Sequence, residues 1–103
     1  MALPKLTPQQ RSEALAQATA SRRRRAEVKK QLKAREMSVS EVFELAEEDD
    51  ALAKMRVVAL LESLPRVGPQ RAGELLVDVG IAPSRRVRGL GPLQRAALVE
   101  RFG

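Results

Sequence analysis

Apolar residues recur along much of the chain at the spacing of an α-helix. Within 57–64 and again within 72–79, they follow each other at intervals of three and four, which places them on one helix face. No segment alternates with a period of two for long enough to predict a strand. The pattern predicts an all-α fold, and the two faces are Val57, Leu60, Leu61 and Leu64, and Ala72, Leu75, Leu76 and Val79.

The N-terminal third predicts one long helix. Thr7 can cap it, Pro8 suits its first turn, and Gln10 completes a capping box. Strong helix formers then continue to about Arg35 without Pro or Gly, and residues 1–6 are expected to form an irregular arm.

This long helix carries only a thin stripe of large apolar residues, at Leu15, Val28 and Leu32. So thin a stripe cannot be enclosed by a core, and we expect the helix to project from the body or to lie along a partner. The chain is therefore expected to divide into an arm with a long helix, 1–37, and a compact four-helix domain, 38–103.

Four shorter helices are predicted in the second part. The first starts at a capping box of Ser38 and Glu41, beside a hydrophobic staple of Met37 and Val42. The boundaries of the other three follow from caps and from Pro and Gly. They run from a cap at Asp49 or Asp50 to Pro65, from Gly68 and Pro69 to Gly80, and from Gly91 and Pro92 to Phe102.

The composition excludes several kinds of chemistry. The 103 residues include no cysteine and no histidine, which rules out disulfides, thiolate chemistry and His or Cys metal sites. No apolar run is long enough to span a bilayer. The acidic residues Glu44, Glu47 and Glu48 lack the partners of a catalytic set and are interpreted as a solvated helix face. We expect a cytoplasmic protein that is not an enzyme and needs no cofactor.

The charge is distributed in blocks. Residues 1–37 hold ten Lys or Arg against three acids, residues 38–53 hold six acids and no base, and residues 54–103 hold nine bases against four acids. The net charge is +6. Two basic segments around an acidic one favour a protein with one side facing a polyanion, although many basic proteins bind none.

Two Gly-containing corners could bind phosphate. At Gly68 the missing Cβ would let the backbone approach an anion, and the N–H groups at the start of the next helix would receive it. At 84–91, Arg85, Arg86 and Arg88 precede a second helix start, and guanidinium groups match phosphate oxygens. Val87 and Leu90 are expected to anchor this loop. An ordinary tight turn and a solvated loop are the alternative interpretations of the two corners, which we expect on one exposed surface.

A third basic feature is the run of four arginines in the long helix. At 100° per residue the run covers most of the helix circumference, so part of it would face any nearby polyanion. Such a distribution suits contact with the phosphate backbone and not with bases. A solvated helix is the competing interpretation. The residues concerned are Arg22, Arg23, Arg24, Arg25 and Lys29.

These pieces, in this order, resemble the actinobacterial type of integration host factor over essentially the whole chain. The resemblance is carried by MALPKLTPQQR, RRRRAEVKKQLK, KMRVVALLESLPRVG at 54–68 and SRRVRGLG at 84–91. It implies a nucleoid-associated protein with a helix-two-turn-helix fold. Such a protein binds duplex DNA with little sequence preference, bends or compacts it, affects supercoiling and assists phage integration.

The resemblance also implies which segments contact DNA: a lid at 64–71 and a two-turn segment at 82–94. Family members usually have Lys at the position of Pro69 and often Gly at that of Arg66. In this chain the basic residue of the lid therefore stands before Gly68, at position 66, and not after it, at position 69. The candidate contacts are Leu64, Pro65, Arg66, Val67, Gly68, Pro69, Gln70, Arg71, Ser84, Arg85, Arg86, Val87, Arg88, Gly89, Leu90, Gly91 and Gln94.

The expected partner is double-stranded DNA, bound by a monomer. An RNA-binding or ribosome-associated structural protein is the alternative, because the same fold occurs in a ribosomal protein and phosphate contacts do not distinguish the two nucleic acids. A helical adaptor for acidic proteins is a third hypothesis.

Overall fold

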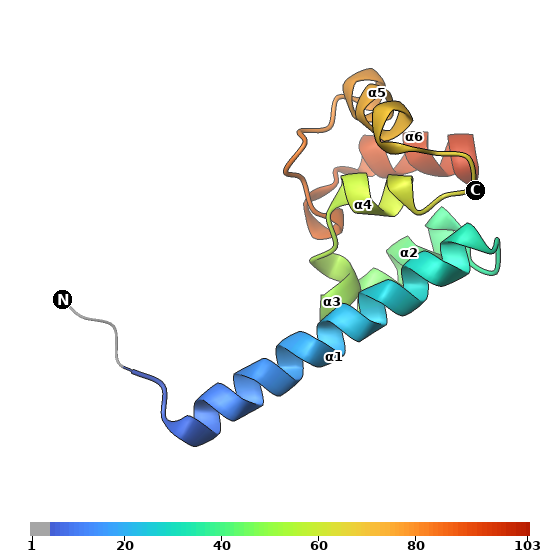
Figure 1. Ribbon diagram of the computed structural model, residues 1–103. Coiled ribbons are helices and arrows are strands. Elements are labelled where there is room, and N and C mark those ends of the chain that lie inside the picture. The colour runs from blue at the N-terminus through green and yellow to red at the C-terminus, as the bar shows by residue number, and fades with distance from the viewer. Residues whose placement is uncertain (1–4) are drawn as a thin grey trace.

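The computed structural model describes residues 5–103, and this part of the chain is all-helical, as predicted (Figure 1). Residues 1–4 of the expected arm lie outside the described range. The elements are α1 (Pro8–Lys33), α2 (Val39–Ala46), α3 (Asp50–Ala53), α4 (Val57–Glu62), α5 (Pro69–Val79), the 3-10 helix η1 (Val87–Gly89) and α6 (Pro92–Phe102).

The predicted caps begin α1 and α2. The Thr7 hydroxyl accepts the backbone N–H of Gln10 at 3.1 Å, and the Gln10 side chain accepts the N–H of Thr7 at 3.0 Å. Ser38 and Glu41 form the same reciprocal pair at 3.1 and 3.3 Å. Both capping boxes are confirmed, because they depend only on residues three positions apart.

The two later helices also begin as predicted, each with Pro after a Gly cap. Gly80 ends α5 in the left-handed conformation, with φ of 78°, which favours glycine.

The single helix predicted between Asp49 and Pro65 is wrong. Asp49 does cap a helix, but α3 ends at Ala53 and α4 starts only at Val57, so the body has five α-helices in its described part. The backbone between them is held by another segment: Val57 N–H donates to the Arg85 carbonyl at 3.0 Å. Residues 54–56 therefore leave the helical conformation, because the backbone here pairs with the segment around Arg86.

The core is aliphatic and lies where α4, α5 and α6 meet α2 and the C-terminal half of α1. Val28 and Leu32 of α1 are buried in it, whereas residues 8–18 are exposed and this half of α1 projects from the body (Figure 1). Projection is thus confirmed for the N-terminal half only. The division of the chain at residue 37 stays a prediction.

Over residues 5–103, no helix is both long and apolar enough to cross a membrane.

Candidate nucleic-acid interface

The break between α3 and α4 lies directly beside the two-turn segment. Arg56 and Arg86 form an isolated antiparallel bridge, and Val87 N–H donates to the Met55 carbonyl at 2.9 Å. The pairing brings residues of two distant segments together on the surface. They form what we call the bridge cluster: Lys54, Arg56, Arg85, Arg86 and Arg88, all exposed.

Two guanidinium groups of the bridge cluster are oriented by backbone carbonyls. Arg85 Nη1 donates to the Gly89 carbonyl at 2.8 Å, and Arg86 Nη1 donates to the Lys54 carbonyl at 2.6 Å. Carbonyls orient a guanidinium without neutralising its charge. The remaining donors are available to a ligand.

The bridge cluster is short of negative charge. Lys54 pairs with Asp50 at 2.9 Å, but within residues 5–103 none of the four arginines forms an ion pair. Like charges held this close repel each other, and an anion bound among them relieves that repulsion. Because a guanidinium donates in a planar fork, phosphate is a good match.

The backbone of the two-turn segment is anchored from below. Val87 is completely buried and Leu90 is 6% exposed, which confirms that they anchor the loop. Their side chains therefore cannot reach a ligand, although they were among the predicted contacts. Ser84 and Gly89 lie on the surface, and Gly91 is half-buried.

Gln94, one of the candidate contacts, has a structural role that the sequence pattern did not predict. Its Oε1 accepts the N–H of Gly91 at 2.9 Å, and its Nε2 donates to the carbonyl of Gly80 at 2.9 Å. The side chain thus caps α6 and ties it to the end of α5.

The lid presents backbone donors around Gly68. Leu64 and Val67 are buried, whereas Gly68 and Gln70 are exposed, and no side chain caps the first turn of α5. A Cβ on Gly68 would meet no atom within 4 Å, so the space above this backbone is open. The uncapped N–H groups of α5 suit an anion.

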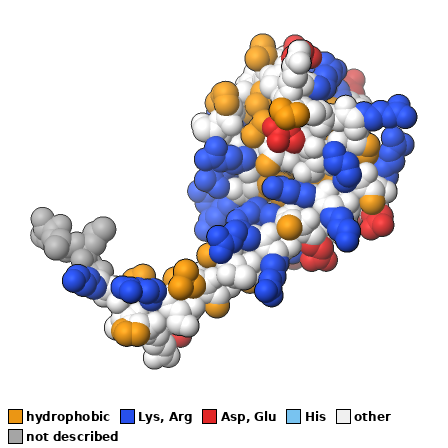
Figure 2. Space-filling view, in the orientation of Figure 1, with side chains coloured by type: hydrophobic (Ala, Val, Ile, Leu, Met, Phe, Trp, Pro, Cys, Tyr) orange, Lys and Arg blue, Asp and Glu red, His pale blue; other side chains and the backbone are white. Residues whose placement is uncertain are grey.

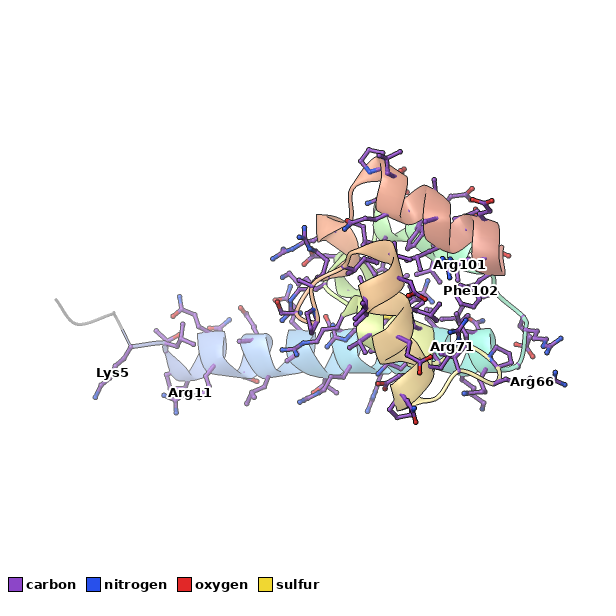
Figure 3. All side chains as sticks on the ribbon, turned by 90° about the horizontal axis from the view of Figure 1, so that it is seen from above. Lys5, Arg11, Arg66, Arg71, Arg101 and Phe102 are labelled. Atoms are coloured by element: carbon purple, nitrogen blue, oxygen red, sulfur yellow. The ribbon has the colours of Figure 1, made fainter. Side chains whose placement is uncertain are left out.

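Four further lid residues are exposed or half-buried. Arg66 has φ of 65°, a left-handed conformation that is strained for any residue other than Gly. Its side chain points away from the body (Figure 3). Arg71 pairs with Glu74 at 3.4 Å. Pro65 is half-buried and Pro69 is exposed.

The two corners are exposed but not adjacent. The two-turn segment contacts the start of α4 and the lid follows its end, so a helix about 9 Å long separates them, roughly the rise of three base pairs. Figure 2 shows Lys and Arg side chains dense on the side of the two-turn segment and present again on the side of the lid. The two corners therefore lie at opposite ends of α4, and their joint contact with one duplex stays a prediction.

Two arginines of the run, Arg24 and Arg25, make hydrogen bonds within the protein. Arg24 Nε donates to Asp49 at 2.8 Å, and Arg25 donates to the Ala51 carbonyl at 3.4 Å. This face of α1 packs on α3, and DNA contact by Arg24 and Arg25 stays a prediction. The hydrogen bond from Arg24 keeps the pKa of Asp49 below its ordinary value. The exposed remainder is Arg22, Arg23 and Lys29.

Sequence reasoning missed Lys54 and Arg56 as site residues. Both stand in the segment KMRVV, which the pattern assigned to a helix interior. The signal that could have found them is charge: two cations flank Met55 at the start of an apolar face.

Comparison with known proteins gives consistent matches. Residues 32–102 match the family model of the S13-like H2TH domain. The chain is 52% identical over 103 residues to the integration host factor of Mycobacterium tuberculosis, covering all of this chain and 98% of that protein. It is 54% identical to that of Streptomyces coelicolor, again over all of this chain and 96% of the other.

A solved structure is similar as well. It is described as sIHF bound to an 8bp palindromic DNA, is 51% identical in sequence, and superposes with a TM-score of 0.83. The match covers 85% of this chain and 99% of that one.

Proposed function

Because this chain belongs to the integration host factor family of actinobacteria, we propose that it binds duplex DNA as a nucleoid-associated protein. The single observation that carries the proposal is the bridge cluster. Three of its arginines lie in the two-turn segment and the fourth, Arg56, pairs with that segment, and none of the four forms an ion pair within residues 5–103. The similar structure that contains DNA supports it.

The contacts are proposed to be with phosphates. The groups that reach outward at both corners are guanidinium groups and backbone N–H groups, which position a protein on the duplex without reading its sequence. The one amide in the two-turn segment that could read a base edge, Gln94, is engaged by Gly80 and Gly91. Little sequence preference follows from this arrangement.

Bending or compaction of DNA is a further part of the proposal, together with influence on supercoiling and phage integration. Contacts at both ends of α4, with Arg22 and Arg23 on α1 as a secondary site, are spread over separate elements. A duplex that follows all of them has to deform. Ring closure of a short DNA fragment tests this part: the protein should accelerate closure, and an unchanged rate would contradict it.

The binding proposal is tested by titrating a short duplex at several salt concentrations. If about five phosphates are neutralised, log affinity falls against log salt with a slope of about −4 to −5. Unrelated duplex sequences should give the same slope. Retention on DNA that does not respond to salt would contradict the phosphate mode.

Duplex RNA of equal length serves as the competitor at fixed salt. Phosphate contacts alone do not distinguish the two nucleic acids, so the expected preference for DNA rests on the family and on the similar structure that contains DNA. Stronger binding of RNA would favour the alternative of an RNA- or ribosome-associated structural protein, which shares the S13-like H2TH fold.

A further inference from the structure

A groove of about 880 Å³ lies between the N-terminal half of α1 and the junction of α2 with α3. The wall formed by α1 consists mainly of small side chains. The opposite wall is largely acidic, with Leu45 in its middle. The groove is lined by Ala14, Gln17, Ala18, Ser21, Glu44, Leu45, Glu48 and Asp50, among others.

The small-residue wall continues a helix face that is buried farther along. Val28 and Leu32 lie on that face and are buried in the core. At 100° per residue, Ser21, Ala18 and Ala14 follow on the same face towards the N-terminus. The body covers one half of this face and leaves the other half open to the groove.

The charge of the groove calls for a cationic occupant. Both basic side chains that line the groove already form ion pairs within the chain, Arg24 with Asp49 and Lys54 with Asp50. Glu48 forms no ion pair within residues 5–103, and neither does Glu44. The surplus carboxylates repel phosphate, so this surface does not suit DNA.

The segment 5–20 has a small net positive charge, from Lys5 and Arg11 against Glu13. Arg11 is exposed and, with Lys5, lies on the part of the chain that projects away from the body (Figure 3). Leu15 is 61% exposed, which makes it one of the most exposed large apolar side chains. A helical segment without tertiary contacts gains little stability of its own in water.

We propose that two copies of this chain pair through the groove, each inserting the N-terminal half of its α1 between α1 and the α2–α3 junction of the other. A twofold arrangement is self-complementary, since the same surface then serves as groove and as occupant. The small side chains Ala14 and Ala18 let two antiparallel helices approach closely. Leu15 is buried against Leu45 of the second copy.

The register follows from the crossing point. If the helices cross between Ala14 and Ala18, Arg11 of one copy lies opposite Ser21 of the other. Ser21 and Glu48 line the same groove. Arg11 therefore reaches Glu48 of the second copy, and this contact occurs twice in the pair.

The pair is weak. Each copy contributes only half of one helix and one open groove, which places the interface in the smallest class of protein interfaces, so we expect dilute protein to be monomeric. Copies held together on DNA reach the concentration at which pairing occurs. The proposal goes beyond DNA binding, and neither the interface nor its test needs DNA.

Sedimentation velocity of the full chain without DNA, from about 10 µM to about 500 µM, tests the proposal. The chain should shift from monomer to dimer over this range. Arg11→Glu and Glu48→Lys should each stay monomeric. An equimolar mixture of these two variants should dimerise again, because the new Glu faces the new Lys and the other contact keeps its original residues.

The matched controls are Arg101→Glu and Glu100→Lys on α6, which make the same charge changes at exposed positions away from the groove. They should dimerise like the unchanged chain. A wild-type chain that stays monomeric throughout, or a mixture no better than its components, overturns the proposal. Titration of DNA with these variants at low concentration, where no pairing is expected, tests the proposed DNA binding separately.

Discussion

Arg56 and Arg86 are paired through their backbones in an isolated antiparallel bridge, and both side chains are exposed. The bridge is fixed on both sides by hydrogen bonds, from Val57 N–H to Arg85 and from Val87 N–H to Met55. Val57 and Val87 are completely buried. The basic surface is therefore preorganised, since the residues beneath it belong to the core.

Replacing Arg56 by Ala should weaken binding to every duplex alike. The loss of one phosphate contact makes the salt slope less steep by about 0.9. The free energy of unfolding should barely change, because the Arg56 side chain is exposed and makes no hydrogen bond or ion pair within residues 5–103. Duplex titration at several salt concentrations, with urea denaturation beside it, measures both. An unchanged slope would remove Arg56 from the interface.

Replacing Gln94 by Ala should lower the stability of the fold and leave the salt dependence of DNA binding unchanged. The variant loses the cap on Gly91 and the bond to Gly80, which costs about 1 to 2 kcal/mol of unfolding free energy. Its salt slope should stay the same. Gln70→Ala, at an exposed position in the first turn of α5, is the control and should be neutral for stability. A changed slope with intact stability would restore Gln94 as a DNA contact.

Replacing Arg66 by Gly should stabilise the fold while weakening DNA binding. Glycine relieves the left-handed backbone at φ of 65°, a gain of about 1 kcal/mol. The lost cation makes the salt slope less steep. Arg35→Gly is the matched control, because Arg35 has φ of 62° in the turn after α1. It should stabilise equally and leave the slope unchanged; equal slopes for both variants would exclude Arg66 from the contact.

The bond between Arg24 and Asp49 should appear as acid sensitivity. The pKa of Asp49 is lowered in the folded chain, chiefly by this hydrogen bond, so its contribution to stability is complete above the unfolded pKa of about 3.9. It is lost as the pH falls through the lower folded pKa.

Asp49→Asn isolates the charge, because Asn still caps α3 at Ala51. Denaturation between pH 7 and pH 2 should show the variant less stable at neutral pH, with the difference shrinking below about pH 4. A constant difference across this range would mean that the carboxylate charge does not matter.

The sequence predicted what local interactions determine. The capping boxes at Thr7 and Ser38, and the Pro and Gly signals at α5 and α6, involve residues close in the chain, and the helix boundaries followed from them. The break at Arg56 escaped prediction because its cause is pairing with a segment distant in sequence. Apolar spacing within 57–64 remains helical on either side of such a break.

The candidate site shows the same limit. The arginines of the two-turn segment could be selected because three cations beside two glycines are a local signal. Whether a cation is free depends on its neighbours in space: Arg24 is taken by Asp49, whereas Arg86 is not taken by any carboxylate within residues 5–103. No spacing rule separates these two cases.

The most direct measurement compares the salt dependence of duplex binding for the unchanged chain and for the double variant Arg85→Ala, Arg86→Ala, with Arg101→Ala as the control. The double variant should bind all sequences more weakly, with a slope less steep by about 1.8, and the control should match the unchanged chain. A double variant that retains the full slope would contradict phosphate binding at the bridge cluster.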